Sequence, residues 1–228
     1  HGGRDHERRT AAGQTTPPSV VGPARRHAVP RPSAGQAMIQ GVLLAAGYGR
    51  RFDPSGHRSK LLATLPDGRS VAWHAARALC SALPGSIAVI RPGHAVLAEV
   101  LHDAGCRVLE SRDAEAGMGS ALAHAVRDSA GAGGWLVALA DMPWLPVATI
   151  RAVAAAIDQP ERIAAAACDG QRGHPVGFGA AHGAALAALR GDSGARELLR
   201  THPVQLIEAG DDGVLHDVDL PHHLQRAR

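Results

Sequence analysis

The sequence predicts an α/β protein with a mostly parallel β-sheet that carries helices on both faces. Short, continuous apolar runs bounded by Gly, Pro or Asp indicate buried strands. Stretches of helical periodicity lie between these runs, and such an alternation is typical of a parallel sheet covered on both sides. The 228 residues, 45% of them hydrophobic, are enough for one good-sized domain.

The first part of this pattern contains four strand–helix pairs. The first apolar run, IQGVLLAA at residues 39–46, ends where a glycine-containing segment begins. Ser70 is a suitable N-cap for the first helix. The run WLVALA at residues 135–140 is apolar throughout and stops at Asp141. The predicted strands are 39–46, 86–91, 106–110 and 135–140, and the predicted helices are 70–83, 94–104, 119–129 and 146–157.

Beyond residue 160 the pattern changes and predicts a small accessory β/α portion. Residues 162–168 and 175–178 have the composition of two strands, which residues 169–173 would join. Two short helices near 181–190 and 194–200 follow. A strand near 204–207 and a terminal segment near 214–219 complete the chain, in which we find no internal repeat.

The positive charge of the chain is concentrated at its N-terminal end. Residues 1–37 contain six arginines and two acids, whereas the remainder has 18 basic and 19 acidic residues. We therefore expect residues 1–37 to form a disordered basic leader or tail and residues 38–228 to form the folded domain. A near-neutral domain lacks the electrostatic footprint of a nucleic-acid-binding protein, so no nucleic-acid partner is expected.

The apolar runs and the cysteine spacing indicate the cellular location of the protein and the state of its thiols. No apolar run reaches the ~18 residues of a transmembrane helix, and the leader lacks the apolar stretch of a secretory signal. The three cysteines are widely spaced and form no C-x-x-C pair, which argues against a disulfide framework and a zinc site. We expect a cytoplasmic protein without a membrane partner, its cysteines buried as small apolar residues.

Two predicted strand ends carry residues suited to phosphate and metal chemistry. In open α/β sheets, ligands bind beyond the carboxyl ends of the strands. After the first strand come Gly47 and Gly49, whose backbone N–H groups can approach phosphate oxygens, followed by arginines and Lys60 that can neutralise negative charge. After the fourth strand comes Asp141, and Mg²⁺ prefers one or two carboxylates together with phosphate oxygens and water.

Two common phosphate-binding motifs do not fit the glycine segment. A dinucleotide-binding fingerprint needs G-x-G-x-x-G, but Phe52 stands where the third glycine belongs, and no acid ends the second strand. A P-loop needs a glycine directly before its lysine, and Ser59 precedes Lys60. Both readings are therefore disfavoured.

Six motifs in order resemble one family across residues 39–224. They are L-A-A-G-x-G-x-R-F at 44–52, K-L-L at 60–62, G-M-G-S-A-L at 117–122, L-A-D-M-P at 139–143, R-G-H-P-V at 172–176 and D-V-D at 217–219. The set resembles the nucleotidyltransferases of the molybdenum cofactor cytidylyltransferase type, which include related guanylyltransferases. This resemblance implies a doubly wound, Rossmann-like nucleotidyltransferase fold of GT-A-like type. It also implies Mg²⁺-dependent transfer of NMP from an NTP to a phosphorylated acceptor, with release of pyrophosphate.

The resemblance also implies roles for individual residues. Nucleotide binding falls to Leu44, Ala45, Ala46, Gly47, Gly49, Arg51, Lys60, Gly117, Gly119 and Ser120. The catalytic residues implied are Lys60, Arg51 and Asp141. Asp141 is also the implied metal ligand, completed by Asp219 or by Asp217. His174 and Pro175 are the residues expected to contact the acceptor.

The family likeness favours CTP as the nucleotide, with GTP possible, and a molybdopterin-type acceptor. The expected protein partner is a molybdoenzyme or its maturation chaperone. Two alternatives stay open: a guanylyltransferase or other small-metabolite nucleotidyltransferase, and a non-catalytic nucleotide-binding accessory protein for molybdoenzyme maturation.

Three details depart from the family pattern or allow more than one reading. The loop at residues 53–59 is longer than usual and lacks the usual glycine at position 53. Arg50 competes with Arg51 as a phosphate ligand. The segment Gly191 to Arg196 either closes the acceptor pocket or supplies a helix N-cap at Asp192 or Ser193.

Lys60 is the only lysine among 24 basic residues. Arginine serves at every other basic position, and the two side chains are not interchangeable where a compact point charge is needed. The position of this lysine in the K-L-L segment that follows the glycine segment therefore supports a phosphate-binding role.

Overall fold

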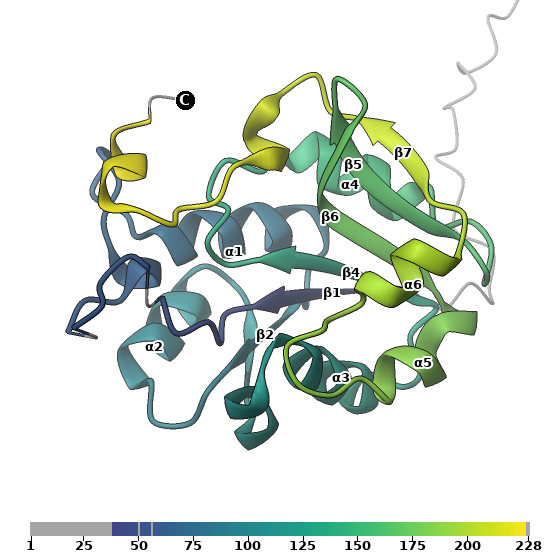
Figure 1. The fold of residues 1–228 in the computed structure, drawn as a ribbon, viewed down its shortest axis with the longest axis horizontal. Helices are drawn as coiled ribbons and strands as arrows, with labels where there is room; N and C mark the ends of the chain where they lie inside the picture. Colours follow the sequence, from purple (N-terminus) through teal and green to yellow (C-terminus); the bar gives the residue numbers. More distant parts are fainter. Residues whose placement is uncertain (1–37, 50, 56, 227–228) are drawn as a thin grey trace, which may run out of the picture. The chain divides into compact units, whose positions relative to one another are not determined.

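A computed structural model describes residues 38–49, 51–55 and 57–226, and the leader predicted for residues 1–37 lies outside them. Seven strands form one mixed sheet in the order β3-β2-β1-β4-β6-β5-β7 (Figure 1). The strands are β1 (Ile39–Leu44), β2 (Ile87–Ile90), β3 (Arg107–Glu110), β4 (Gly134–Leu139), β5 (Ile163–Cys168), β6 (Gln171–Gly179) and β7 (Gln205–Glu208).

The predicted parallel sheet is confirmed for β1 to β4. β1 pairs in parallel with β2 and β4, and β2 pairs in parallel with β3. The accessory portion extends this same sheet: β6 runs antiparallel to both β4 and β5, and β7 runs parallel to β5. The strand order reverses between β2 and β4 on either side of β1, which is where open α/β sheets bind their ligands.

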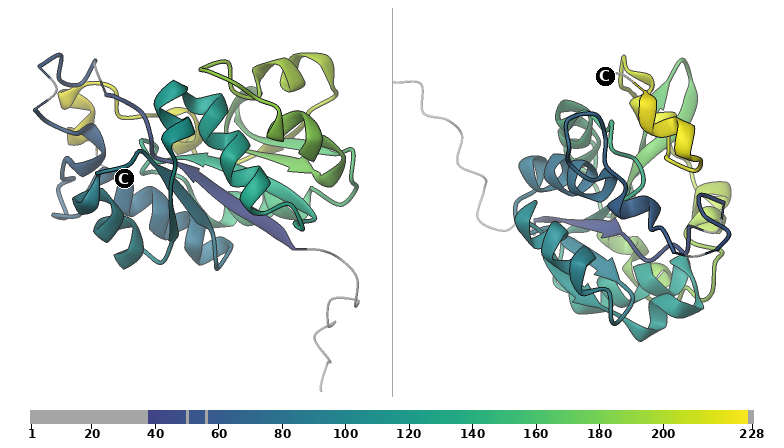
Figure 2. Two further views of the ribbon diagram at one scale, coloured as in Figure 1. Left: turned by 90° about the horizontal axis from the view of Figure 1, so that it is seen from below. Right: turned by 90° about the vertical axis from the view of Figure 1, so that its left-hand side faces the viewer.

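Helices cover both faces of the sheet (Figure 2). The helices are α1 (Val71–Ala82), α2 (Ala95–Asp103), α3 (Met118–Asp128), α4 (Val147–Ala155), α5 (Gly183–Ala187) and α6 (Arg196–Thr201). On one face, α1, α2 and α4 pack against Leu43, Ile90 and Leu136. On the other, α3 and α5 pack against neighbouring residues of the same strands, including Val42 and Val137. This division follows from the alternation of side chains along a strand.

A local sequence signal explains where α1 begins. Ser70 caps α1 as expected, because its side chain accepts a hydrogen bond from the backbone N–H of Trp73. Five short 3-10 helices also occur among the described residues, and only the third overlaps a predicted helix, the one near 181–190. Segments this short carry too little periodicity to be predicted. The five are η1 (Lys60–Leu62), η2 (Arg112–Ala116), η3 (Ala180–His182), η4 (Asp212–Leu215) and η5 (Pro221–Gln225).

The prediction of residues 169–173 as a connection between strands is wrong. β6 begins at Gln171, so only Asp169 and Gly170 form the turn, with φ of 51° and 74°. An Asp-Gly pair adopts positive φ at both central positions of a two-residue hairpin, which lets the strands pair up to the turn. His174 is therefore a strand residue.

The segment before α6 also differs from the predicted helix boundary. The helix begins at Arg196, and Ala195 is its N-cap, with no side-chain cap hydrogen bond. The N-cap interpretation of Asp192 and Ser193 is wrong, because Asp192 instead caps another element: its carboxylate accepts from the Met118 N–H at the start of α3.

Candidate active site

The glycine segment and Asp141 lie at the same edge of the sheet. β1 and β4 are parallel neighbours whose last residues, Leu44 and Leu139, are in register. The chain leaves β1 into Gly47 and Gly49 and leaves β4 into Asp141. The sheet thus places these two predicted functional segments side by side.

The C-terminal segment brings two more carboxylates to this edge. The N–H of Val218 donates to the carbonyl of Asp141 over 2.8 Å. Gly173 and Gly213 permit close packing of the preceding η4 turn, since an added Cβ would meet the carbonyl oxygens of Val214 at 2.0 Å and Trp144 at 2.4 Å. Asp217 and Asp219 therefore lie beside Asp141.

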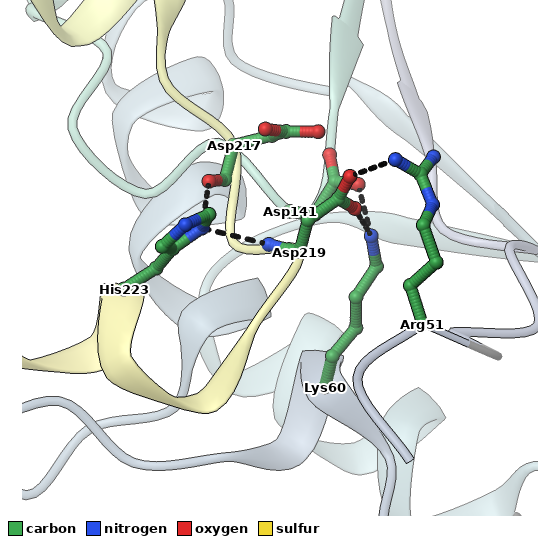
Figure 3. Close-up of polar contacts among 6 residues, drawn as sticks. All are labelled: Arg51, Lys60, Asp141, Asp217, Asp219 and His223. Atoms are coloured by element: carbon green, nitrogen blue, oxygen red, sulfur yellow. Dashed lines mark hydrogen bonds and ion pairs between the residues drawn. The ribbon is translucent and has the colours of Figure 1, made fainter. Parts of the chain in front are cut away.

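His223 also holds this segment in place (Figure 3). Its Nδ1 accepts a hydrogen bond from the Asp219 N–H at 3.2 Å and lies 3.2 Å from the carbonyl oxygen of Asp217. The sequence offered no signal for this contact, which depends on the turn that η5 makes after Leu220.

Two cations lie against these carboxylates (Figure 3). The Lys60 Nζ is 2.7 Å from Asp141 Oδ2 and 3.0 Å from Asp219 Oδ1, and the Arg51 guanidinium is 2.5 Å from Asp219 Oδ2. The Lys60 side chain is 10% exposed and that of Arg51 is 80% exposed. The structure thus brings together the three predicted catalytic residues, Lys60, Arg51 and Asp141.

The environment of Lys60 keeps its side chain charged. Burial lowers the pKa of Lys60, but the charge of Asp141 and hydrogen bonds to Asp141 and Asp219 outweigh burial and raise that pKa above its ordinary value. Lys60 therefore remains an ammonium ion throughout the neutral range.

The three carboxylates have the composition of a site for a hard divalent cation. Oxygens of Asp141, Asp217 and Asp219 all lie within 4.8 Å of one another. Asp141 Oδ1 is shielded from solvent and has no hydrogen-bond partner among the described residues. Burial, followed by the negative charges of Asp219 and Asp141, raises the pKa of Asp217. A crowded oxygen cluster with one unsatisfied oxygen fits a cation such as Mg²⁺.

A cavity of about 150 Å³ adjoins this charged cluster. Gly47, Lys60 and Asp141 line one part of it, and Gly117 and Met118 line another. The full set of lining residues is Leu44, Ala46, Gly47, Tyr48, Lys60, Leu61, Gly117, Met118, Ala121, Leu139, Asp141 and Asp192. The cavity therefore joins the glycine segment to the G-M-G-S segment.

Five predicted nucleotide-binding residues do not line this cavity: Ala45, Gly49, Arg51, Gly119 and Ser120. Ala45 is buried in the core on the α1 face. Gly119 and Ser120 instead hold the loop at residue 191: the Gly119 N–H donates to the Gly191 carbonyl over 2.8 Å, and the Ser120 hydroxyl accepts from the Gly191 N–H over 2.9 Å. Since their polar groups face that loop, their structural role is to support the cavity wall. Gly49 lies outside the cavity but over Lys60, whose Cγ would be 3.4 Å from an added Cβ.

Replacing Gly117 with alanine is expected to damage the cavity wall. Gly117 has φ of 131°, and an added Cβ would lie 2.3 Å from Asp192 Oδ1 and 2.6 Å from the backbone of Gly191. We expect a loss of about 1–3 kcal/mol in unfolding free energy and weaker nucleotide binding. Denaturant unfolding and equilibrium dialysis with CTP would measure the two effects. Gly131→Ala is the matched control, because nothing lies within 4 Å of its added Cβ; equal behaviour of the two variants would contradict this account.

Tyr48 and Arg91 were not predicted as site residues. The Tyr48 hydroxyl donates to the carbonyl of Glu115 over 3.2 Å, which links the glycine segment to the turn before Gly117. The guanidinium of Arg91, at the end of β2, lies 3.9 Å from the centre of the Tyr48 ring. No local motif could have predicted contacts between residues so far apart in the sequence.

A second cavity, of about 180 Å³, adjoins the first and shares Leu44, Met118, Leu139 and Asp192 with it. His174, Ser193 and Arg196 add polar groups, while Val176 and Phe178 contribute an apolar floor. His174 Nδ1 is shielded from solvent without a hydrogen-bond partner among the described residues. Pro175 is not among the lining residues, because side chains alternate along β6.

Burial lowers the pKa of His174, and the opposing attraction of Asp141 does not compensate. The neutral ring is therefore favoured in the folded protein. Below the ordinary histidine pKa of about 6.5, the unfolded chain takes up a proton that the folded protein does not. We expect the unfolding free energy to fall by up to about 1.4 kcal/mol per pH unit from this residue as the pH drops below that value.

Denaturant unfolding at pH 7.5, 6.5 and 5.5, read as a difference between wild type and His174→Gln, would isolate this effect. The variant should lose stability less steeply with falling pH. His57→Gln, at an exposed position, is the control and should follow wild type. Parallel pH profiles for wild type and His174→Gln would contradict the assignment.

A larger cavity of about 530 Å³ lies away from the charged cluster, between α1, α4 and the η4 turn. Its charged side chains are largely paired with one another, as in Arg226 with Asp212 and His74 with Asp67. We therefore place the chemistry at the strand ends, where charged groups converge on one cavity.

The cysteines are consistent with the predicted packing role. Cys80 and Cys106 are buried, and Cys168 is half-buried. All three carry free thiols, and the sulfurs of Cys80 and Cys106 lie 3.0 Å apart.

Comparison with known proteins assigns the family. The model of the MobA-like NTP transferase domain matches residues 41–206, which is most of the chain and includes the glycine segment, Lys60 and Asp141. The chain belongs to this family. Its fold is thus that of a nucleotidyltransferase domain.

Two curated relatives share this similarity along nearly their full lengths. The purine catabolism protein PucB of Bacillus subtilis is 32% identical over 200 residues, covering 82% of this chain and 95% of PucB. The nicotine blue oxidoreductase of Paenarthrobacter nicotinovorans is 32% identical over 201 residues, with the same coverage of each chain.

A solved structure, Rv0371c from Mycobacterium tuberculosis, superposes with a TM-score of 0.71 at 26% identity, covering 83% of this chain and 97% of its own. The manganese complex of the same protein has a TM-score of 0.63 at 25% identity, covering 76% of this chain and 89% of its own. Among the described residues of the present chain, no helix is long and apolar enough to cross a membrane.

Proposed function

We propose that the protein transfers CMP from CTP to a molybdopterin-type acceptor phosphate, with release of pyrophosphate and dependence on Mg²⁺. The observation that carries this proposal is the convergence of Lys60, Arg51 and three aspartates beside a cavity walled by the glycine segment. The family assignment supports a nucleoside triphosphate as substrate.

The glycine segment and its cations are suited to the triphosphate. Gly47 lines the cavity, and no atom lies within 4 Å of the position of an added Cβ, so a ligand can approach its backbone closely. Lys60 lines the same cavity, and the exposed Arg51 guanidinium pairs with Asp219, a carboxylate that Lys60 also contacts. These groups would orient the phosphates and offset their negative charge.

Asp141 and Asp219 would hold the divalent cation, with Asp217 beside them. When bound, such a cation would hold phosphate oxygens against the carboxylates and offset the charge that develops during transfer. The manganese complex of Rv0371c supports a divalent cation in a relative of this fold. The choice of Mg²⁺ rests on the family resemblance.

The reaction needs positioning and charge compensation more than covalent participation by the protein. An oxygen of the acceptor phosphate would form a bond to the α-phosphorus, opposite the bond to the β-phosphate oxygen. That second bond breaks, and pyrophosphate leaves with its electron pair. Because the attacking phosphate is already anionic, no general base is required; Lys60 and Arg51 would reduce repulsion between the two anions.

The second cavity is the proposed acceptor site. It shares a wall with the nucleotide cavity, as an acceptor close to the α-phosphate requires. The unpartnered His174 Nδ1 can accept a hydrogen bond from a ligand, and Arg196 can meet an anionic group. Ser193 and its neighbours close this cavity, which supports the predicted role of the segment at residues 191–196.

Pyrophosphate release from CTP, GTP, ATP and UTP, each with and without molybdopterin and with Mg²⁺ or excess chelator, tests the proposal. Release from CTP that requires both molybdopterin and Mg²⁺ is the expected result. Preference for GTP would assign a guanylyltransferase instead. If no nucleotide turns over but CTP still binds, the protein is a nucleotide-binding accessory protein for molybdoenzyme maturation. Under the main proposal, a molybdoenzyme or its chaperone would receive the product in the cytoplasm.

A further inference from the structure

The cations that would bind phosphates already neutralise the carboxylates that would bind the divalent cation. Lys60 Nζ has three protons to donate, and two of them point to Asp141 Oδ2 and Asp219 Oδ1 at 2.7 and 3.0 Å. The Arg51 guanidinium holds the other oxygen of Asp219 at 2.5 Å. In this arrangement, the same groups cannot serve phosphate and carboxylate fully at once.

We propose that Lys60, assisted by Arg51, acts as an internal counter-ion latch that suppresses divalent-cation binding until a nucleoside triphosphate draws these side chains away. This inference rests on the proposed function, because it takes the adjoining cavity as the nucleotide site. It goes further by making cation and nucleotide binding interdependent.

The charge balance of the cluster supports the latch. Three ionised aspartates would carry a formal charge of −3, which Lys60 and Arg51 reduce to −1. Without the positive charge of Lys60 or of Arg51, the cluster would be one unit more negative and would attract a divalent cation more strongly. While the Lys60 ammonium is paired with these carboxylates, it therefore weakens the binding of a divalent cation.

The geometry also allows the latch to open. The Arg51 side chain is 80% exposed and is held by one carboxylate, so it can turn toward solvent or a phosphate. The Lys60 side chain lies against Gly49, which belongs to the glycine segment that would bind the triphosphate. Lys60 also lines the proposed nucleotide cavity. A polyphosphate in that cavity would compete directly for both cations. By thermodynamic reciprocity, nucleotide and divalent cation must then favour each other's binding by the same factor.

The alternative is that these ion pairs are permanent parts of the fold. In that case Lys60 would orient the carboxylates for the cation, and its removal would weaken cation binding. The two accounts predict opposite signs for the same substitution, which makes the choice between them experimental.

The test is Mn²⁺ binding to the nucleotide-free, full-length protein, followed by the electron paramagnetic resonance signal of free Mn²⁺. Lys60→Gln should bind Mn²⁺ at least roughly 10-fold more tightly than wild type, the factor expected when charges about 4 Å apart are screened almost as strongly as in water. Arg51→Gln should shift affinity in the same direction by a smaller factor, since its guanidinium is more exposed. Asp141→Asn should bind more weakly than wild type.

Arg69→Gln is the matched control, because it removes the same net charge at an exposed pair with Asp103, away from the cluster. Its Mn²⁺ affinity should equal that of wild type. Circular dichroism checks folding of every variant; if Lys60→Gln does not fold, Arg51→Gln decides the question. Unchanged or weaker Mn²⁺ binding in the deciding variant overturns the latch. This readout needs no turnover, so a failed latch and a failed transferase assignment are separate results.

Discussion

Asp141→Asn is expected to lower nucleotidyl transfer by about 100- to 1,000-fold while the protein stays folded. Asp141 belongs to the three-carboxylate cluster, and its Oδ1 lacks a hydrogen-bond partner among the described residues. An asparagine keeps the shape of the side chain but loses the negative charge that a divalent cation needs. Because Asp219 still forms an ion pair with Lys60 in this variant, the Lys60 ammonium keeps a partner and the protein should stay folded.

The measurement is pyrophosphate release at saturating CTP and acceptor across a range of Mg²⁺ concentrations. A folded variant with low activity that higher Mg²⁺ partly restores would indicate a lost cation ligand. Asp158→Asn is the control, since Asp158 forms an exposed ion pair with Arg162 far along the chain from the site, and it should keep full activity. Wild-type turnover in Asp141→Asn at every Mg²⁺ concentration would rule out Asp141 as the cation ligand.

Lys60→Arg is expected to retain fold and charge but to lose about 10- to 100-fold in turnover, the loss typical of a misplaced electrostatic contact. The Lys60 ammonium is nearly buried between two carboxylates and lies against Gly49. A guanidinium is larger and planar, and it binds carboxylates through a rigid fork. It would stay paired with Asp141 and Asp219 more firmly and reach phosphate oxygens with the wrong geometry.

Steady-state kinetics with CTP, together with thermal unfolding, would test this variant. A melting temperature close to wild type with a large fall in turnover is the expected combination. Comparison with Lys60→Gln separates charge from shape: if shape matters, the arginine variant should recover little of the activity that the glutamine variant loses. Near-normal turnover of Lys60→Arg would show that any positive charge suffices at this position.

The order of strands and helices was predictable because each element carries its own periodic signal. The parallel strands β1 and β4 appear in the sequence as apolar runs, and parallel pairing brings their carboxyl ends to one edge. Gly47 and Asp141 follow these two strands, so the sequence predicts that they lie at the same edge of the sheet. The hairpin between β5 and β6 was misjudged because the Asp-Gly turn is shorter than the polar stretch around it.

The supporting residues of the site could not be predicted in this way. Asp192 lies against Met118, Tyr48 against Glu115, and His223 against Asp219, each through the packing of separate elements. Ser120 matched a family motif, yet its hydroxyl serves the loop at Gly191. Motif position indicates that a residue is near a site, but not which way its side chain points.

The sequence by itself determined the alternating fold, the two functional strand ends and the single lysine placed after the glycine segment, because local periodicity and residue chemistry are properties of short stretches. Only the tertiary structure decided that Lys60 and Arg51 rest on Asp141 and Asp219 instead of standing free for phosphates. That pairing depends on distances between residues far apart in the chain, and electrostatic energies change steeply over those distances. The latch proposed for Lys60 depends on this pairing.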